Sequence, residues 1–275
     1  DMPTPTHRGH AFTLIELLVV IAIIATLIAI LLPALTRSRD VAEQVIEQSA
    51  ARQTMLAMHV YSDDYRGRII PGYYNSPSHY SGLRITVPDG TTITGEPLKR
   101  WPWRLSSYLN HKIGGSLLVG EMEPWTTPGH NVAGDWAYEV SLWPSLGMNM
   151  YWVGGQENTW PAGNHVGHRD DVAAPSRLIA FSSARYNPNP PSSDYRHGYF
   201  WVGPKHRPGN PGWAPWAYEE AQESLNFGHL HPRHRGKAVT AHMDGHSELL
   251  SLDELRDMRY WSDAAYRAGD PDYLW

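Results

Sequence analysis

The longest apolar stretch of the chain lies near its start, at residues 12–35, and it contains a single charged side chain, Glu16. Apart from Glu16, only Thr13, Thr26 and Pro33 interrupt it. About 20 consecutive apolar residues are enough for a helix to cross the hydrocarbon core of a bilayer. A helix in the core of a soluble protein would show polar residues at every third or fourth place. The pattern therefore predicts a membrane-spanning helix.

Beyond this stretch the apolar residues continue at helical spacing, now with charged residues between them. We expect one helix from Phe12 to about Tyr61, which at 1.5 Å per residue is about 75 Å long. Residues 12–35 would lie in lipid, and residues 36–62 would form an amphipathic half against a globular head at residues 63–275. The apolar stripe of that half would consist of Val41, Val45, Ile46, Met55, Leu56, Met58 and Val60.

Short apolar runs separated by turn residues predict a β-rich head. The runs at residues 83–87 and 91–94 flank Asp89 and Gly90, and this pairing predicts a hairpin. Residues 177–184 have the composition of a buried strand, and the proline-rich segment 187–216 is expected to be an ordered insertion or a flexible loop. With the long helix, these runs predict the α+β class.

A second hairpin is predicted at residues 236–252, where two strand-like runs surround Asp244 and Gly245. We expect Gly245 to have a positive φ, which glycine adopts without steric cost. Ser251 and Glu254 have the spacing of a capping box, which predicts a terminal helix from Leu252 to about Met258.

Composition narrows the function classes. The net charge is −5, so the chain lacks the basic character of a general nucleic-acid-binding protein. There is no cysteine, and hence no disulfide. Six of the 12 tryptophans are expected to fill the core of the head, with binding of glycans to the rings as the alternative: Trp101, Trp103, Trp136, Trp143, Trp152 and Trp201. A short amphipathic helix at residues 100–109 would point Trp101, Trp103, Leu105 and Leu109 inward.

Several histidines near the C-terminus raise the question of a metal site. If no turn intervened, His242, Asp244 and His246 would face one side of a strand. Because Asp244 and Gly245 are expected to form the turn, we expect these side chains to be scattered, and we predict no metal ligand and no cofactor. The acidic pairs that could offer oxygen ligands to calcium lack the alternating spacing of an EF-hand. The groups considered are His229, His231 and His234 beside the three residues above, and the pairs Asp63/Asp64 and Asp170/Asp171.

A catalytic role is not expected either. The serines Ser182 and Ser183 lack the Gly-x-Ser-x-Gly context of a nucleophile elbow, and the many histidines make chance neighbours common. The sequence therefore predicts that the chain is not an enzyme.

The start of the chain resembles the type IV pilin and type II secretion pseudopilin family. The resemblance rests on the basic segment with Arg8, the small residue Ala11, and Phe-Thr-Leu-Ile-Glu leading into the apolar run. It implies that residues 1–11 are a leader, that a prepilin peptidase cuts between Ala11 and Phe12, and that the new amino terminus is methylated. The family usually has glycine before the cut, where this chain has Ala11. Pro33 is at a place where pilin helices commonly carry a proline.

The end of the chain resembles a pseudopilin-like family with a carboxy-terminal motif of histidine, nine residues, aspartate and glycine, here His234, Asp244 and Gly245. The two resemblances cover residues 8–72 and 229–262. They imply a pilin-like fold and assembly into a helical homo-oligomeric filament, either a pilus or a pseudopilus. They also imply an inner-membrane assembly platform as a partner, a place in the bacterial inner membrane before assembly, and a periplasmic or extracellular place afterwards.

Two alternatives stay open from the sequence. Glu16 either reaches to water from one turn inside the membrane or pairs with the Phe12 amine of a neighbouring subunit. The whole chain is either a filament subunit or a membrane-tethered extracytoplasmic binding module that never polymerises. The position of Glu16 beside a peptidase site favours the filament.

Overall fold

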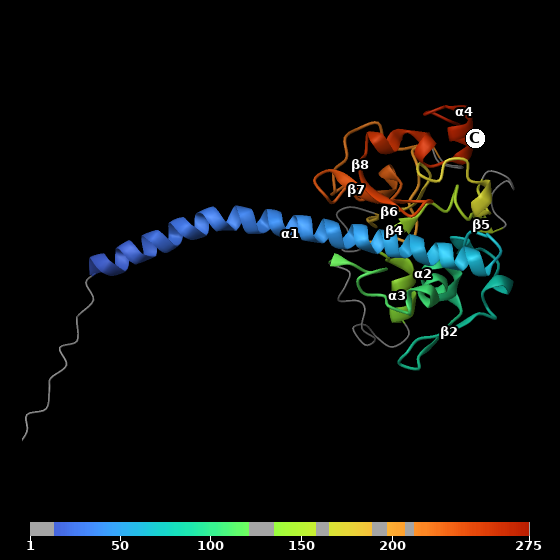
Figure 1. Ribbon diagram of the computed structural model, residues 1–275, viewed down its shortest axis with the longest axis horizontal. Helices are drawn as coiled ribbons and strands as arrows, with labels where there is room; N and C mark the ends of the chain where they lie inside the picture. The colour runs from blue at the N-terminus through green and yellow to red at the C-terminus, as the bar shows by residue number, and fades with distance from the viewer. Residues whose placement is uncertain (1–13, 121–134, 158–164, 189–196, 207–211, 275) are drawn as a thin grey trace, which may run out of the picture. The chain divides into compact units, whose positions relative to one another are not determined.

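The computed structural model describes residues 14–120, 135–157, 165–188, 197–206 and 212–274 (Figure 1). Its first element is helix α1, Leu14–Asp64, which contains Pro33 in its interior. The chain divides into two units, residues 1–43 and 44–275, and each is described here by itself. The predicted cut site at Ala11 and Phe12 lies outside the described residues.

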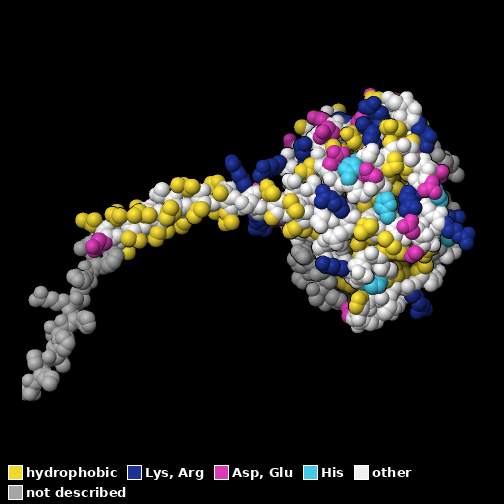
Figure 2. Space-filling view, viewed as in Figure 1, with side chains coloured by type: hydrophobic (Ala, Val, Ile, Leu, Met, Phe, Trp, Pro, Cys, Tyr) yellow, Lys and Arg dark blue, Asp and Glu magenta, His cyan; other side chains and the backbone are white. Residues whose placement is uncertain are grey.

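In the first unit, the large aliphatic side chains of α1 are exposed around the helix. An 18-residue window of α1 has a mean hydropathy of 3.1 and none of it is buried, so length and composition qualify the helix as a membrane span. Figure 2 shows apolar side chains covering this part of α1, followed by Lys and Arg side chains where the apolar stretch ends.

The second unit is built around a four-stranded antiparallel sheet with strand order β4-β6-β7-β8. The strands are β4 (Leu146–Met148), β6 (Ile179–Ser183), β7 (Lys237–His242) and β8 (Ser247–Ser251). All five residues of β6 are buried, which confirms the buried strand predicted at residues 177–184. The hairpin predicted at residues 236–252 is also confirmed, because β7 pairs with β8 from Lys237↔Ser251 to Ala241↔Ser247.

The two faces of this sheet carry separate apolar clusters. Val239, Ala241 and Phe181 belong to the cluster that also contains Met55 and Met58 of α1. Ala238, Leu250 and Ile179 belong to the other cluster, which includes Leu255, Met258, Trp261 and Ala265 from the end of the chain. The register between β6 and β7 shifts between Ile179 and Phe181. The sheet is thus covered by the α1 end segment on one face and by the C-terminal segment on the other.

Smaller elements complete the head. The hairpin predicted at residues 83–94 is confirmed, with Ile85 opposite Ile93 and the Thr91 N–H donating to Asp89 Oδ1 at 2.8 Å. Trp101, Trp103 and Leu105 of α2 are fully buried as predicted, and Leu109 packs partly buried against the core. The remaining bounds are β1 (Tyr73–Tyr74), β2 (Arg84–Thr86), β3 (Thr92–Thr94), α2 (Trp101–Ser106), α3 (Asp135–Leu142), β5 (Gln156–Glu157) and α4 (Asp263–Ala268), with 3₁₀ turns between them.

The predicted terminal helix from Leu252 to Met258 is wrong. The capping box does form, since Glu254 Oε2 accepts from the Ser251 N–H at 2.8 Å and the Glu254 N–H donates to Ser251 Oγ at 3.3 Å. It opens only a 3₁₀ turn, Glu254–Arg256. The helix ends there because Asp257 is extended and its carboxylate accepts from the Arg259 N–H, which starts the next 3₁₀ turn, Met258–Tyr260.

The predicted apolar stripe on residues 36–62 is also wrong in most of its members. Met55 and Met58 are buried, but Val41, Val45, Ile46, Leu56 and Val60 are 43–65% exposed. The buried face consists of Glu47, Ala50, Ala51, Thr54, Met55, Ala57, Met58 and Ser62. Most of these side chains are small, and Met55 and Met58 are the large apolar ones among them. The fold is a long apolar N-terminal helix followed by a head that contains a β-sheet, an α+β arrangement consistent with a pilin-like fold.

Candidate functional site

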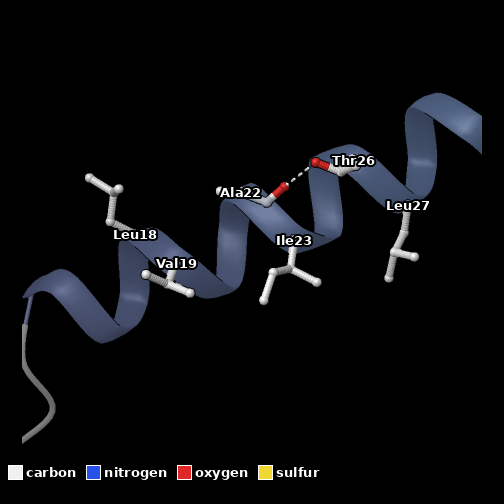
Figure 3. Close-up of a pocket in the computed structure, with 6 residues that line it drawn as sticks. All are labelled: Leu18, Val19, Ala22, Ile23, Thr26 and Leu27. Atoms are coloured by element: carbon white, nitrogen blue, oxygen red, sulfur yellow. Dashed lines mark hydrogen bonds between the residues drawn. The ribbon is translucent and has the colours of Figure 1, made fainter.

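One face of the apolar half of α1 presents a shallow groove on the helix surface (Figure 3). It is lined by Leu18, Val19, Ala22, Ile23, Thr26 and Leu27. The Thr26 hydroxyl donates to the Ala22 carbonyl at 2.8 Å, so its own helix satisfies it. The groove therefore offers hydrocarbon to whatever covers it, lipid or another apolar helix.

Glu16 lies in the first turn of α1. The unpaired N–H groups of a first turn carry partial positive charge, which favours a carboxylate there. Pro33 lies inside the helix, where it removes one backbone donor. The Thr36 hydroxyl donates to the Leu32 carbonyl and the Ser38 hydroxyl to the Ala34 carbonyl, each at 3.0 Å. The assembly residues inferred from the family resemblance are thus carried by one continuous helix.

A second carboxylate of α1, Glu47, lies in the buried face of the helix and is 2% exposed. Ala50, Ala51 and Thr54, which follow it at helical spacing, are buried as well. Sequence reasoning missed Glu47, because it looked for large apolar residues. The pattern that indicates this buried face is a set of small residues at helical spacing next to one acidic residue, Glu47.

Glu47 meets the histidine of the C-terminal motif. His234 Nε2 lies 2.6 Å from Glu47 Oε2, and Arg233 Nε lies 3.7 Å from the same oxygen. Burial raises the pKa of Glu47, but the charges of Arg233 and His234 and the hydrogen bond from His234 outweigh it, so the pKa stays below its usual value. Arg233 is itself held by the Ala184 carbonyl, which accepts from Nη2 at 2.6 Å. The pair ties the helix to the sheet across 187 positions of sequence.

The motif spacing follows the length of strand β7. His234 forms a bridge with Lys237 at the start of β7, and Asp244 and Gly245 follow the strand at its other end. His234 therefore contacts α1 at one end of the strand while the aspartate and glycine turn the chain at the other. The nine intervening residues are the run into the strand, the strand itself and the first turn residue.

The turn has the geometry expected of its residues. Gly245 has a φ of 95°, and its N–H donates to the His242 carbonyl at 2.8 Å. The Asp244 carboxylate accepts from the His246 N–H at 3.1 Å and from the His246 ring, whose Nδ1 lies 2.6 Å away. A Cβ added at Gly245 would meet no atom within 4 Å, so only the backbone conformation restricts this position to glycine.

The expectation that the turn scatters the histidines is wrong. The three-residue loop of Met243, Asp244 and Gly245 leaves His242 and His246 opposite each other across the hairpin. Their rings stack with centroids 4.3 Å apart and planes 8° apart. His229 lies elsewhere and bonds to Ser224, while His231 lies 3.3 Å from Glu220.

The candidate catalytic and glycan-binding residues are used by the fold. Ser182 and Ser183 are fully buried, and both hydroxyls donate to the Val239 carbonyl, at 3.0 and 3.4 Å. Of the six tryptophans considered for glycan binding, Trp143 is partly buried and the other five are 8% exposed or less, namely Trp101, Trp103, Trp136, Trp152 and Trp201. Their rings therefore offer little surface to a sugar. The acidic pairs weighed for calcium also have other partners: Asp63 is 2.8 Å from Arg169, and Asp170 is 3.8 Å from His168.

Comparison with known families finds a match for the start of the chain alone. Residues 7–32 match the model of the prokaryotic N-terminal methylation motif, a stretch that includes Ala11, Phe12 and Glu16. No curated protein matches the chain, and no solved structure matches it. The match supports a pilin-like or pseudopilin-like substrate of a prepilin peptidase, anchored in a membrane by its apolar helix, with a structural rather than catalytic role. It does not extend to His234, Asp244 and Gly245.

Proposed function

We propose that the chain is a structural subunit of a type IV pilus-like filament or a type II secretion pseudopilus. The observation that carries the proposal is the coincidence of the methylation motif at residues 7–32 with a helix whose aliphatic side chains are exposed on all sides. A helix that is apolar all round needs either lipid or other apolar helices around it. A subunit that passes from the membrane into a filament is surrounded first by lipid and then by the apolar helices of other subunits.

Processing prepares this transfer. A prepilin peptidase removes residues 1–11 by cutting between Ala11 and Phe12, and the new Phe12 amine is methylated. Before assembly the subunit lies in the bacterial inner membrane, with its head outside the cytoplasm. Subunits of the same chain then enter the filament from an inner-membrane assembly platform, and the filament extends into the periplasm or beyond the cell.

Glu16 sets the register of assembly in this proposal. In the apolar filament core, the Glu16 carboxylate of an incoming subunit pairs with the Phe12 amine of a neighbour. A buried charge is costly unless it is paired. A subunit that enters one step out of register leaves both charges unpaired, and the penalty opposes its entry. Pro33 lies near the end of the apolar stretch, where neighbouring helices can shield the carbonyl that proline leaves without a donor.

The test is the mass of the amino terminus in two fractions, the sheared surface material and the membrane. The proposal expects sheared protein that begins at Phe12, with the added mass of a methyl group. Sheared filaments that retain residues 1–11 would refute both the processing and the amine pairing. Processed protein found only in the membrane fraction, with none in sheared material or in an isolated pseudopilus, would favour the tethered binding module.

A further inference from the structure

The C-terminal hairpin gathers three metal-ligating side chains at its turn. His242 Nε2 lies 3.2 Å from Glu248 Oε1, and His246 Nε2 lies 3.8 Å from the same oxygen. All three ligand atoms lie within 4.8 Å of one another. The hairpin register explains the grouping, because His242 is opposite His246 and Thr240 is opposite Glu248, and residues two apart on a strand share a face.

The hydrogen bond made by Nδ1 of each ring leaves Nε2 as the electron-pair donor, and the Thr240 hydroxyl lies 3.1 Å from His242 Nε2. His242 Nδ1 lies 3.1 Å from the Arg177 carbonyl, which can only accept, so Nδ1 carries the hydrogen. His246 Nδ1 lies 2.6 Å from the Asp244 carboxylate, which likewise accepts. In the neutral rings both Nε2 atoms are then electron-pair donors beside the Glu248 carboxylate. A cation between them would bind all three donor atoms and would take the place of the Thr240 hydroxyl at His242 Nε2. That hydroxyl has a second acceptor, the Glu248 carbonyl at 3.3 Å.

These contacts are those that orient histidine ligands in metal sites. A metal-bound histidine usually donates its other ring N–H to a backbone carbonyl or a carboxylate, which sets the tautomer and the direction of the ring. Here His242 has a backbone carbonyl as its partner, that of Arg177, and His246 has a carboxylate, that of Asp244. Asp244 therefore has a second use beside shaping the turn.

The donor set favours zinc. Two imidazoles and one carboxylate with an open fourth position are a known zinc arrangement, and bonds of about 2.0–2.1 Å put tetrahedral ligands about 3.4 Å apart. The 3.2 Å between His242 Nε2 and Glu248 Oε1 is close to that separation, and His246 Nε2 lies 3.8 Å from the same oxygen before its ring turns. The charges of Glu248 and Asp244 balance a dication. The Arg177 guanidinium is engaged elsewhere, 3.3 Å from Asp257 and over the ring of Tyr260.

The site combines a fixed ligand with two accessible ones. The His242 side chain is fully buried, while His246 and Glu248 are 40% and 41% exposed. The two rings are stacked nearly parallel, and a metal must lie in the plane of each ring that binds it. The His246 ring must therefore turn out of the stack, and its exposure permits this motion. An ion can enter from solvent without opening the sheet.

We propose that His242, His246 and Glu248 form a zinc site at the turn of the C-terminal hairpin, with Asp244 orienting His246. This differs from the expectation of no metal ligand drawn from the sequence. It is also independent of filament assembly. A bound ion would join β7 to β8 at the end of the sheet opposite the His234–Glu47 pair.

The test uses the full chain in detergent, stripped with chelator and titrated with zinc chloride alone. We expect one zinc per chain and a rise in the melting temperature of the head, because an ion that binds only the folded state stabilises it. Cobalt added to the stripped chain should show the visible absorption of tetrahedral coordination. His246→Ala and Glu248→Gln should abolish the cobalt spectrum and the thermal shift, and Asp244→Asn should weaken binding by roughly 10–100-fold.

His79→Ala is the matched control, since His79 is an exposed histidine on a separate 3₁₀ turn, Pro77–His79. It should bind zinc as the parent chain does. Because His246 and Glu248 are partly exposed, their variants should melt normally without metal, which separates lost binding from lost folding. Absence of stoichiometric zinc in the parent, or equal binding by parent and His246→Ala, would overturn the proposal. Equal loss in His79→Ala would also overturn it, by showing nonspecific histidine binding.

Discussion

Helix α1 carries two glutamates in apolar surroundings, and they are satisfied in different ways. Glu47 has its partners within the chain, at 2.6 Å from His234 and 3.7 Å from Arg233. Glu16 lies in the apolar half of the helix, and the proposed partner is the amine of another subunit. Burying a carboxylate costs several kcal/mol unless a cation and hydrogen bonds compensate for the lost water. This holds for Glu47 in the head and would hold for Glu16 in the core of a filament. One pair holds a subunit together, and the other would hold subunits to each other.

Glu47→Gln tests the internal pair. The amide keeps the shape of the side chain but removes the charge, leaving Arg233 without its buried counter-ion. Breaking a buried pair from one side costs roughly 3–5 kcal/mol. We expect the free energy of unfolding of the head to fall by an amount in this range, measured by denaturant titration with tryptophan fluorescence.

The control for Glu47→Gln is Glu43→Gln, one turn earlier on the same helix. Glu43 is 49% exposed and pairs with Arg39 at 2.9 Å. Exposed i,i+4 pairs contribute about 0.3–0.5 kcal/mol, so this variant should unfold almost as the parent does. Equal effects of the two substitutions would show that the Glu47 pair contributes nothing particular to stability.

Glu16→Leu tests the proposed pair between subunits. The variant makes the membrane segment more apolar, so insertion and cleavage should continue. In the filament it leaves the Phe12 amine unpaired, at a cost of roughly 3–5 kcal/mol, against a gain of about 1.5–3 kcal/mol from one more buried apolar side chain. Processed protein should accumulate in the membrane and be missing from the sheared fraction, as measured by immunoblotting.

Thr26→Leu is the comparison for Glu16→Leu. It also removes a polar group from the apolar half of the helix, but the Thr26 hydroxyl is already satisfied by the Ala22 carbonyl. It should be processed and assembled normally. A normal filament yield from Glu16→Leu alone would contradict the amine pairing and remove the main argument against the tethered module.

At the scale of elements, the length of strand β7 explains the spacing of the C-terminal motif. His234 and the Asp244-Gly245 turn lie at opposite ends of β7. The spacing between them is therefore the length of this strand plus the two residues that precede it and the one that follows it. The turn depends on a left-handed backbone conformation at Gly245. This conformation is costly for any residue with a Cβ.

Gly245→Ala should destabilise the head by about 1 kcal/mol or more, because alanine at a φ of 95° is strained although no neighbour obstructs its Cβ. Thermal or denaturant unfolding measures this directly. Gly82→Ala is the matched control, since Gly82 also has open space around its Cβ position but no positive φ. If both variants were equally stable, the turn would not require glycine.

At the scale of the whole molecule, buried groups with lowered pKa values make the head sensitive to acid. They include His231, Glu47 and His242, whose pKa burial lowers to about 4. Burial, aided by the charge of Arg233, lowers the pKa of His231 to about 3, although Glu220 opposes the shift. The unfolded chain therefore binds a proton at His231 first, and the stability present above about pH 6.5 is lost as the pH falls toward 3. The lowered pKa of Glu47 adds a further loss below its usual value of 4.5.

We expect the free energy of unfolding to decrease by up to about 1.4 kcal/mol per pH unit for each group in its range. Denaturant titrations between pH 7 and pH 4 measure the slope. His231→Gln removes the first group, so its slope over this interval should be smaller than that of the parent. A parent slope near zero, or an unchanged slope in the variant, would show that His231 does not remain neutral in the folded head.

Local features of the sequence determined much of this protein. The length and apolarity of residues 12–35 predict the exposed helix, Asp89-Gly90 and Asp244-Gly245 predict the two hairpins, and the apolar run at residues 177–184 predicts the buried strand. Each depends on neighbours a few positions away, through helix length, turn conformation or burial of a continuous run. The methylation motif is local as well, which is why the start of the chain could be assigned and the head could not.

The tertiary structure decided which face of α1 is buried and which polar side chains meet. Of the large apolar residues predicted to face the head, only Met55 and Met58 are buried, and Ala50, Ala51 and Thr54 share the buried face with them. Glu47 and His234 are 187 positions apart, and no local pattern relates them. His242 and His246 were expected to separate at the turn, yet the three-residue loop leaves them paired across the hairpin. Contacts of this kind depend on strand register and on packing between distant segments, which only the folded chain defines.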